Sequence, residues 1–312
     1  MLPFIHLFGQ DVPMYGLLML TGGILAVLFA CIRGGRRGLD RLDVLLAAIF
    51  AFIGGLLGAK VLFILTDIPN MIEHFRVVGF SFSWLLNRIA TAGIVFYGGL
   101  LGGLFGGWVY TRLFYIDFWK HADAMIPFLP LGHAFGRLGC FCAGCCYGRQ
   151  IDPPWGVHFA SGLGGADPAL TYFPSQLLEA VFDLALLFPI LLIFSRKDRK
   201  HGQIVGLYMV CYGIFRFFNE FLRGDEIRGI FFGISTSQWI SLALVPIGIV
   251  LLSGVLSQRF KLNAPAVDDG IIEVMTDEEF ARQESEAVEK IAEAETASGE
   301  NTSGGKPETT EE

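Results

Sequence analysis

The chain has 312 residues, of which 53% are hydrophobic and only 17% are charged. Soluble globular domains carry about 25% charged residues, so this composition excludes an ordinary soluble protein. The net charge of −7 is unevenly spread, because the residues from Pro265 onward hold 15 Asp or Glu and 3 Lys or Arg, which leaves +5 for the rest. The sequence has no basic patch interleaved with aromatic residues, so nucleic acid is not an expected partner.

The apolar residues lie in long runs, and a helix needs about 20 of them to cross a bilayer. We therefore expect an all-α polytopic membrane protein with about seven transmembrane helices in residues 1–262. An acidic cytoplasmic tail at 263–312 is expected to be partly helical, after the capping-box pattern that begins at Thr276, and then disordered. The expected spans are 13–31, 44–66, 90–111, 122–140, 176–194, 204–222 and 236–256.

The loops between these spans carry Lys and Arg unequally, with 12 on one side and 5 on the other. Short cytoplasmic loops are enriched in Lys and Arg. This predicts a protein with its N-terminus outside and its tail inside. The first apolar run is preceded by no Lys or Arg and followed by arginines, the reverse of a signal peptide, so it is expected to be a retained helix.

Glycines recur at intervals of four in two of the expected spans. Gly54 and Gly58 lie in the second span, and Gly98, Gly102 and Gly106 lie in the third. In membranes such small-xxx-small series let helix backbones approach closely. We interpret most of these glycines as packing positions.

Charged residues inside the expected spans need a reason, since each costs about 2.5–3.5 kcal/mol on insertion scales. Lys60, Arg137, Arg216 and Glu220 are such residues. Helical spacing puts Arg216, Glu220 and Arg223 on one face. They form either a structural ion-pair ladder or a site for an anionic group such as phosphate, which arginine binds bidentately.

Six polar residues of the expected spans lie at a similar depth in the membrane. With the predicted orientation, they fall in the outward-facing halves of their spans, and His133 lies one turn before Arg137 on the same face. A site for an anionic lipid headgroup at the outer leaflet would explain this. The residues concerned are Tyr15, Tyr97, Arg137, Arg216, Glu220 and Arg223.

Four of the six cysteines lie in one short segment with the spacing C-x-C-x2-C-C. They are Cys140, Cys142, Cys145 and Cys146. This spacing is not that of a paired C-x2-C zinc site, and cysteine is also a good small apolar residue. Local packing is therefore favoured, ahead of a disulfide on an oxidising face and of a metal site. The other two cysteines are expected to be ordinary membrane-core residues.

Six short elements follow one another along the membrane part. They are Met14-Tyr15-Gly16-Leu17, Gly58-Ala59-Lys60, Phe96-Tyr97-Gly98-Gly99-Leu100, the segment from Gly136 to Gly148, Pro174-Ser175-Gln176-Leu177-Leu178-Glu179 and Arg216-Phe217-Phe218-Asn219-Glu220-Phe221-Leu222-Arg223. In this order they resemble the motifs of the prolipoprotein diacylglyceryl transferase family, whose signature is approximately G-R-x-G-N-F-x-N-x-E-x-x-G. The resemblance covers about residues 13–256 and leaves out the tail.

The chain also departs from the family motifs. Tyr97 stands where the family commonly has His, Lys60 replaces Arg, and Phe173 replaces the His before Pro-Ser-Gln. Cys140, Ala143 and Cys145 occupy the Asn, Asn and Glu positions of the signature. These departures bear most on which residue would act as the general base.

The resemblance implies an enzyme of the bacterial plasma (inner) membrane with its active site toward the outer leaflet. Its partners would be phosphatidylglycerol, the lipobox segments of prolipoproteins and membrane lipid, without a metal or cofactor. The diacylglyceryl group would pass to the lipobox cysteine as a thioether, and glycerol phosphate would leave. The leaving group is anionic, so cations that stabilise its developing charge should lower the barrier.

Arg137 and Arg216 are the expected catalytic cations, and Tyr97 is expected to orient a phosphate or a thiol. Tyr97 is a poor base, with a reference pKa of about 10, and His133 is a speculative substitute. Gln176 and Glu179 are interpreted as structural. The residues expected to bind substrate are Arg137, Tyr15, Gly98, Gly99, Gly139, Glu220 and Arg223.

Three other functions remain open at this point. A divergent family member would use another lipid or acceptor, because cysteines occupy signature positions. A non-enzymatic protein would bind an anionic lipid without chemistry. A thiol redox or metal protein would use the cysteine segment.

Overall fold

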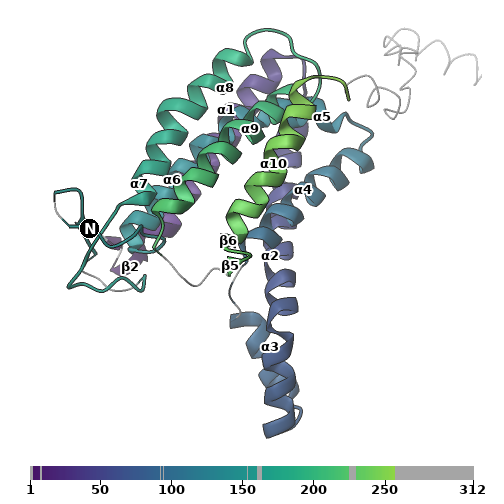
Figure 1. Ribbon diagram of the computed structural model, residues 1–312. Coiled ribbons are helices and arrows are strands. Elements are labelled where there is room, and N and C mark those ends of the chain that lie inside the picture. Colours follow the sequence, from purple (N-terminus) through teal and green to yellow (C-terminus); the bar gives the residue numbers. More distant parts are fainter. Residues whose placement is uncertain are drawn as a thin grey trace, which may run out of the picture. The chain divides into compact units, whose positions relative to one another are not determined.

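The computed structural model describes residues 3–7, 9–91, 93, 95–152, 154–159, 164–224 and 230–256, and the tail predicted for 263–312 lies outside them. The described part is mostly helical (Figure 1). Its helices are α1 (Met14–Arg36), α2 (Arg41–Val78), α3 (Phe82–Thr91), α4 (Phe96–Leu113), α5 (Phe118–Met125), η1 (Ile126–Phe128), α6 (Leu129–Ala143), α7 (Ser175–Val181), η2 (Phe182–Leu187), α8 (Phe188–Phe194), α9 (Gln203–Asn219), η3 (Glu220–Leu222) and α10 (Thr236–Leu252).

Short antiparallel strand pairs accompany these helices. They are β1 (Phe4–Leu7) with β2 (Gln10–Pro13), β3 (Val157–His158) with β4 (Thr171–Tyr172), and β5 (Ile230–Phe231) with β6 (Ile234–Ser235). The all-helical prediction is therefore correct for most of the described chain but omits these strand pairs.

Several helices are long and apolar enough to cross a membrane. They are α1, α2, the continuous helix Ser175–Phe194 and the segment Gln203–Leu222. The pair α3 and α4 passes the same test jointly, although the two helices are bent by 83°. The structure thus supports a multi-pass membrane protein with four or five candidate spans among the described residues. The predicted span 122–140 is divided among α5, η1 and a 15-residue α6.

The exposed surface of these helices is that of a protein immersed in lipid. Leu20 on α1 is 63% exposed, Phe52 on α2 is 64% exposed and Leu101 on α4 is 65% exposed. Large apolar side chains left in water on such a scale would be unfavourable. In a bilayer these side chains face hydrocarbon at no cost. The buried residues of this protein are therefore mainly those at close helix contacts and polar ones.

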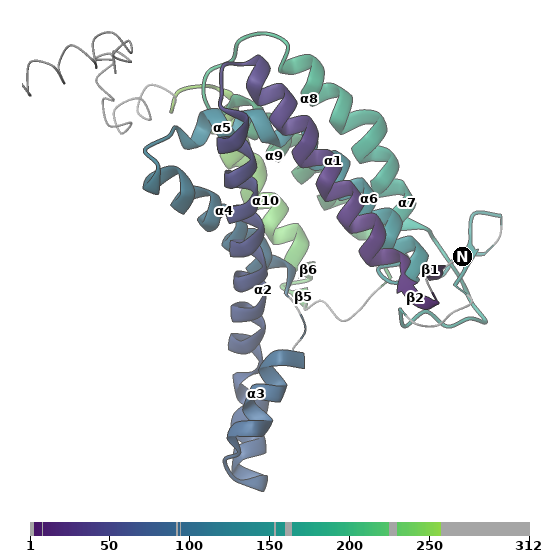
Figure 2. The ribbon, with the colours of Figure 1, turned by 180° about the vertical axis from the view of Figure 1, so that it is seen from behind.

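The glycine series predicted from sequence joins α2 to α4. A Cβ added to Gly54 would lie 3.0 Å from the Cα of Gly106, and one added to Gly58 would overlap the carbonyl oxygen of Gly98. The two backbones are therefore in direct contact along this seam, which confirms the packing interpretation. Figures 1 and 2 show α4 against the middle of α2.

Polar contacts attach α3 to the far end of α2 and explain one intramembrane charge. The Lys60 ammonium donates to the carbonyl oxygens of Ile89 and Ala90, each at 3.2 Å, where α3 ends before the bend. Arg88 forms two hydrogen bonds with Asp67, Nε to Oδ2 at 2.8 Å and Nη2 to Oδ1 at 2.9 Å. Lys60 thus satisfies carbonyls that a continuous helix would have paired internally.

A second group of helices carries the segment from Gly136 to Gly148, which we call the signature segment. α6 packs along α1, α7 packs on α6, and α9 packs along α10. Between α7 and α8 the chain forms a π-helical segment, η2, which contains the fully buried Asp183. Such π segments often occur at functional sites. The predicted continuous span at 176–194 is present, but its middle is wound differently from an α-helix.

Candidate active site

A buried carboxylate on α7 connects three helices. Glu179 is 1% exposed. Its Oε1 accepts hydrogen bonds from Arg137 Nη2 at 2.9 Å and from the Tyr212 hydroxyl at 3.0 Å. Its Oε2 accepts one from Asn219 Nδ2 at 3.2 Å. Arg137 comes from α6, and Tyr212 and Asn219 come from α9. We call these four residues the Glu179 cluster, since its carboxylate holds the others together.

His133 lies beside this cluster with a carboxylate at each ring nitrogen. Its Nε2 is 3.6 Å from Glu179 Oε1, and its Nδ1 is 3.0 Å from Asp183 Oδ2. Its position one turn before Arg137 on the same face is as predicted. His133 thus lies between two buried carboxylates.

Arg216 is the centre of a second polar group, and it is 7% exposed. Its Nη2 is 2.5 Å from Glu220 Oε2 and donates to the hydroxyl of Ser237 on α10 at 2.9 Å. The Ser237 hydroxyl in turn shares a 3.3 Å hydrogen bond with that of Tyr97 on α4. We call Arg216, Glu220, Ser237 and Tyr97 the Arg216 cluster. The predicted catalytic residues Tyr97 and Arg216 are thereby brought together through a serine that sequence reasoning did not single out.

The prediction that Arg223 shares a helical face with Arg216 and Glu220 is wrong. Helix α9 ends at Asn219, a short 3-10 turn follows, and Arg223 has an extended backbone with φ −81° and ψ 146°. The chain straightens there because it pairs with the signature segment, with a bridge between Arg223 and Gly148. The Arg223 side chain is nevertheless buried, and its charge interacts with the Glu179 carboxylate.

Both predicted cationic residues carry unused buried donors. Among the described residues, no hydrogen-bond acceptor reaches Arg137 Nε or Arg216 Nη1, although both atoms are buried. A buried donor without a partner costs about 1–3 kcal/mol, and more when it is charged. Such donors need an explanation, and an anionic ligand with several acceptor oxygens would satisfy them.

The signature segment turns sharply after α6, and hydrogen bonds from α7 hold it in place. Gly144 has φ +71°, which ends α6 in a left-handed turn. Gln176 Nε2 donates to the carbonyl of Cys145 at 2.7 Å, and the Ser175 hydroxyl donates to that of Cys146 at 3.0 Å. Ser175 and Gln176 are each 1% exposed. The Ser-Gln pair therefore has the structural role expected of Gln176.

On the other side of this segment, Gly139 packs against Tyr15. A Cβ at Gly139 would lie 3.1 Å from Tyr15 Cδ2 and 3.2 Å from its Cα. The Tyr15 phenol interacts electrostatically with Arg137 and with Cys140. Tyr15 and Gly139, both predicted to contact substrate, thus lie beside Arg137.

The predicted substrate contacts Gly98 and Gly99 lie in the seam between α2 and α4. A Cβ at Gly98 would be 2.6 Å from the Cβ of Leu62, and one at Gly99 would be 3.5 Å from the Gly55 carbonyl oxygen. Both glycines follow Tyr97 at the start of α4. Their contact with a substrate stays a prediction, while close packing accounts for the absence of side chains.

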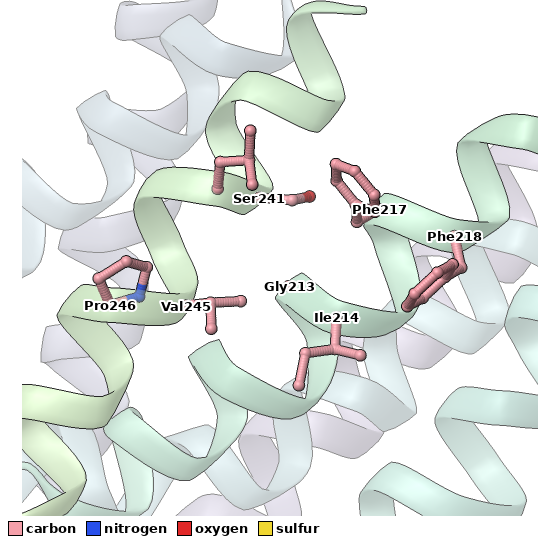
Figure 3. Close-up of a pocket in the computed structure, with 8 residues that line it drawn as sticks. Gly213, Ile214, Phe217, Phe218, Ser241, Val245 and Pro246 are labelled. Atoms are coloured by element: carbon pink, nitrogen blue, oxygen red, sulfur yellow. The ribbon is translucent and has the colours of Figure 1, made fainter. Parts of the chain in front are cut away.

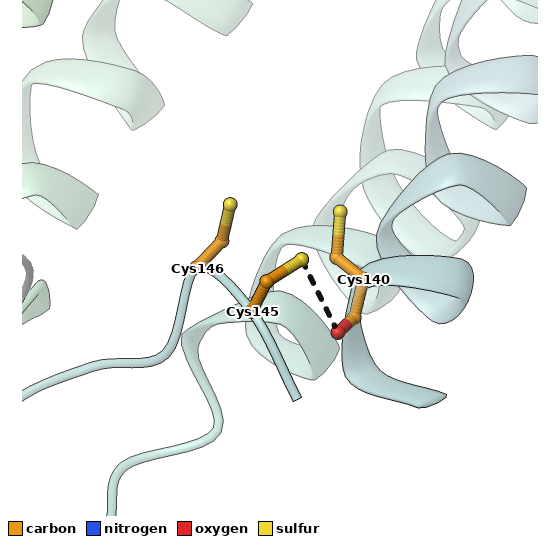
Figure 4. A group of neighbouring side chains, drawn as sticks. All are labelled: Cys140, Cys145 and Cys146. Carbon is orange, nitrogen blue, oxygen red and sulfur yellow. Dashed lines mark hydrogen bonds between the residues drawn. The ribbon is translucent and has the colours of Figure 1, made fainter. Parts of the chain in front are cut away.

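All six cysteines lie in the described residues, and none of them forms a disulfide. Cys140, Cys145 and Cys146 instead form a group of thiols (Figure 4). The Cys145 thiol donates to the Cys140 carbonyl at 3.7 Å. Cys142 is not part of this group.

An apolar groove of about 260 Å³ lies between α9 and α10, close to Arg216 in the chain. Figure 3 shows Phe217 and Val245 on opposite sides of it, with Gly213 leaving room at its base. The Ser241 hydroxyl is hydrogen-bonded to the Ser237 carbonyl at 2.9 Å, so the groove wall does not present a free polar group there. Its lining residues are Gly213, Ile214, Phe217, Phe218, Ser241, Leu242, Val245 and Pro246.

Sequence reasoning found the arginines but not the residues that connect them. Glu179 was interpreted as structural, and Tyr212, Asn219 and Ser237 were not selected. The available signal was the position of Glu179 and Asn219 inside two of the family motifs. Each is a polar residue within an apolar run, which is expensive in a bilayer and therefore calls for a partner.

Comparison with known proteins agrees with this arrangement of motifs. Residues 3–253 match the model of the family described as prolipoprotein diacylglyceryl transferase. A phosphatidylglycerol–prolipoprotein diacylglyceryl transferase of Clostridium tetani is 36% identical over 248 residues, which are 80% of this chain and 95% of the relative. A second enzyme of that name from Clostridium perfringens is 35% identical over 79% of this chain and 92% of the relative. One from Clostridioides difficile is 33% identical over 82% and 96%. The chain therefore belongs to the prolipoprotein diacylglyceryl transferase family.

Proposed function

We propose that this protein transfers the diacylglyceryl group of phosphatidylglycerol to the lipobox cysteine of prolipoproteins. A carbon–sulfur bond forms to the acceptor cysteine, and the bond from the same glycerol carbon to the phosphate oxygen breaks. Glycerol phosphate leaves, and the thiol proton is released. The proposal draws on the names of the relatives and on the chemistry of the two arginine groups.

The observation that carries the proposal is the pair of buried guanidinium groups with unused donors, at Arg137 and Arg216. The leaving phosphate gains negative charge as the carbon–oxygen bond breaks. Fixed cations that donate to its oxygens therefore stabilise the transition state more than the ground state. Glu179 and Glu220 orient the two guanidinium groups, and each leaves part of its arginine free for the ligand.

The apolar groove between α9 and α10 offers a place for the acyl chains of the lipid. The groove between α9 and α10 is apolar and begins next to Arg216 along α9. A phospholipid with its phosphate at Arg216 has its acyl chains in this groove, where they exchange bilayer hydrocarbon for apolar side chains at little cost. The groove faces the lipid side through Ile214 and Phe218, which are 46% and 63% exposed. A lipid substrate can therefore enter sideways from the bilayer.

The protein crosses the bacterial plasma membrane seven times, with its N-terminus outside, its active site toward the outer leaflet and residues 263–312 in the cytoplasm. In support, a cavity of about 600 Å³ at the opposite end of α1 and α9 from the arginine site is lined by four basic residues and two acidic ones, which are Arg36, Arg37, Lys120, Arg199, Asp123 and Asp198. Basic residues at one end and the polar site at the other follow the positive-inside rule.

The test is mass spectrometry of a lipobox peptide after incubation with purified protein in phosphatidylglycerol liposomes. The expected result is a diacylglyceryl mass increase on the cysteine, absent with Arg137→Ala and retained with Arg112→Ala. Arg112 is a matched control, since it is exposed at the end of α4 and lies over the Trp108 ring. If well-folded wild-type protein leaves the peptide unmodified, the proposal is wrong.

A further inference from the structure

The three thiols near Arg137 are arranged as metal ligands would be. The Sγ atoms of Cys140, Cys145 and Cys146 all lie within 4.8 Å of one another. In a tetrahedral zinc site with Zn–S bonds of about 2.3 Å, neighbouring sulfurs are about 3.8 Å apart. Small side-chain rotations would therefore close these thiols onto one ion. Figure 4 shows the Cys140 and Cys146 side chains extending in the same direction, with Cys145 between them.

The backbone that carries these thiols is fixed in an unusual conformation. Cys146 has φ +61°, a region that residues with a side chain rarely adopt. Such strain costs about 1–3 kcal/mol and persists only where the surroundings impose it. Here Gln176 and Ser175 hold the carbonyls of Cys145 and Cys146. The surrounding structure thus maintains the turn that presents the Cys146 thiol to the other two.

The charge of a nearby residue suits a thiolate–metal group. Three thiolates and one Zn²⁺ carry a net charge of −1, and the Arg137 guanidinium interacts electrostatically with both Cys140 and Cys146. A nearby cation lowers the cost of placing such a group in a membrane protein. Sequence spacing favoured local packing, because spacing does not reveal that the turn brings positions 140, 145 and 146 together.

We propose that Cys140, Cys145 and Cys146 bind one Zn²⁺ ion and leave a fourth coordination position open for the acceptor thiol. Three protein ligands and an open position are typical of catalytic zinc. Binding the ion releases the protons of the three cysteines. An acceptor thiol that coordinates the ion loses its proton outright and becomes the thiolate nucleophile. This second part rests on the proposed transferase function, in which the ion would take the place of a general base.

Metal binding is tested first, without lipid or peptide. Purified reduced protein is incubated with zinc, desalted and measured by elemental analysis. The wild type and Cys142→Ser are expected to hold about one zinc ion per chain, and the variant with Cys140, Cys145 and Cys146 all changed to Ser is expected to hold none. Cys142 is the matched control from the same segment. Equal zinc in the triple variant, or none in the wild type, overturns the proposal.

A second measurement uses only the wild type, so that misfolding of a variant cannot mislead. Thiols are alkylated with and without zinc, and the modified peptides are identified by mass spectrometry. Zinc is expected to protect Cys140, Cys145 and Cys146 and to leave Cys142 as reactive as before. Protection of all four cysteines alike, or of none, counts against the site.

The open position is tested with Co²⁺ in place of zinc. A lipobox peptide is expected to change the cobalt–thiolate absorption, and the same peptide with Ser at the acceptor position is not. No change with the thiol peptide refutes the open position. Metal-free enzyme that transfers as fast as zinc-loaded enzyme also refutes it, while the transferase function stands. If the protein binds zinc but transfers no lipid to the peptide, the proposed function is wrong and the metal site stands.

Discussion

Replacing Glu179 by Gln should both destabilise the protein and slow transfer severely. The change keeps the shape of the side chain but removes the charge that Arg137 faces at 2.9 Å. Glutamine also presents an amide donor where Glu179 accepts from Tyr212, Arg137 and Asn219, so at least one of these donors loses its acceptor. Breaking a buried ion pair by removing one partner costs about 3–5 kcal/mol.

The loss of activity should follow from the position of Arg137. In the proposed mechanism Glu179 is a positioning residue, which acts on the phosphate only through the guanidinium it holds. Misplacement of a cation that stabilises the leaving group costs on the order of 10²–10³ in rate. Transfer to a lipobox peptide in phosphatidylglycerol liposomes and the midpoint of thermal unfolding in detergent are the two measurements.

Asp67→Asn is the matched control, since Asp67 is 6% exposed and paired with Arg88 away from the site. It should lower the unfolding midpoint and leave the transfer rate of the remaining folded protein near that of the wild type. The reasoning is refuted if Glu179→Gln transfers at the wild-type rate. It is also refuted if both variants lose activity equally at temperatures where they remain folded.

Three further substitutions test the Arg216 cluster and the packing of α4 on α2. Arg216→Lys keeps the charge but cannot reach Glu220, Ser237 and a ligand together, so liposome assays should give a rate at least about tenfold lower. Tyr97→Phe removes the hydroxyl 3.3 Å from Ser237, and it should slow transfer by about tenfold or less, because a neutral hydrogen bond contributes about 0.5–1.5 kcal/mol. Gly102→Leu should prevent stable expression, since a Cβ there already lies 2.9 Å from the Cα of Gly58.

Each of these has an outcome that would count against it. A fully active Arg216→Lys enzyme would show that only charge matters at that position. Complete inactivity of Tyr97→Phe would mean that the hydroxyl does more than support Arg216 through Ser237. For the seam between α2 and α4, Gly107→Leu is the control, because its Cβ would meet only the Ala51 side chain at 3.9 Å. Equal expression of Gly102→Leu and Gly107→Leu would contradict the packing argument.

The features that sequence predicted well are those that one helix determines by itself. Apolar runs long enough for a bilayer identified α1, α2, the helix at 175–194 and the segment at 203–222. The interval of four between Gly54 and Gly58 predicted a close helix contact. His133 and Arg137 were placed on one face of α6. In each case the spacing along the chain, together with helical geometry, was sufficient.

The bend between α3 and α4 could not be found in this way. The sequence predicts one span at 90–111, which corresponds to α4, whereas the structure adds α3 before it, at an angle of 83° to α4. Near the end of α3, the carbonyls of Ile89 and Ala90 accept hydrogen bonds from Lys60, a residue 29 and 30 positions earlier in the chain. Only the contact of α2 with α3 explains why a cation lies at that depth.

Glu179 was missed for a related reason. Ion pairs within one helix are visible as i, i+4 spacing, and the pair of Arg216 with Glu220 was found through it. The partners of Glu179 lie on α6 and α9, so no spacing along the chain connects them. A buried acid within an apolar run was the available signal, and it points to a partner without naming one.

Helix α9 also carries a polar stripe that the sequence analysis did not select, and this stripe explains how the two arginine groups are coupled. Tyr212, Arg216 and Asn219 are separated by four and three residues, so they lie on one face of α9. Tyr212 and Asn219 donate to Glu179, while Arg216 donates to Ser237. The helix ends after Asn219 because the following residues pair with the signature segment at Gly148. A single helix face therefore fixes the position of Arg216 relative to the carboxylate that holds Arg137, as the proposed action of both cations on one phosphate requires.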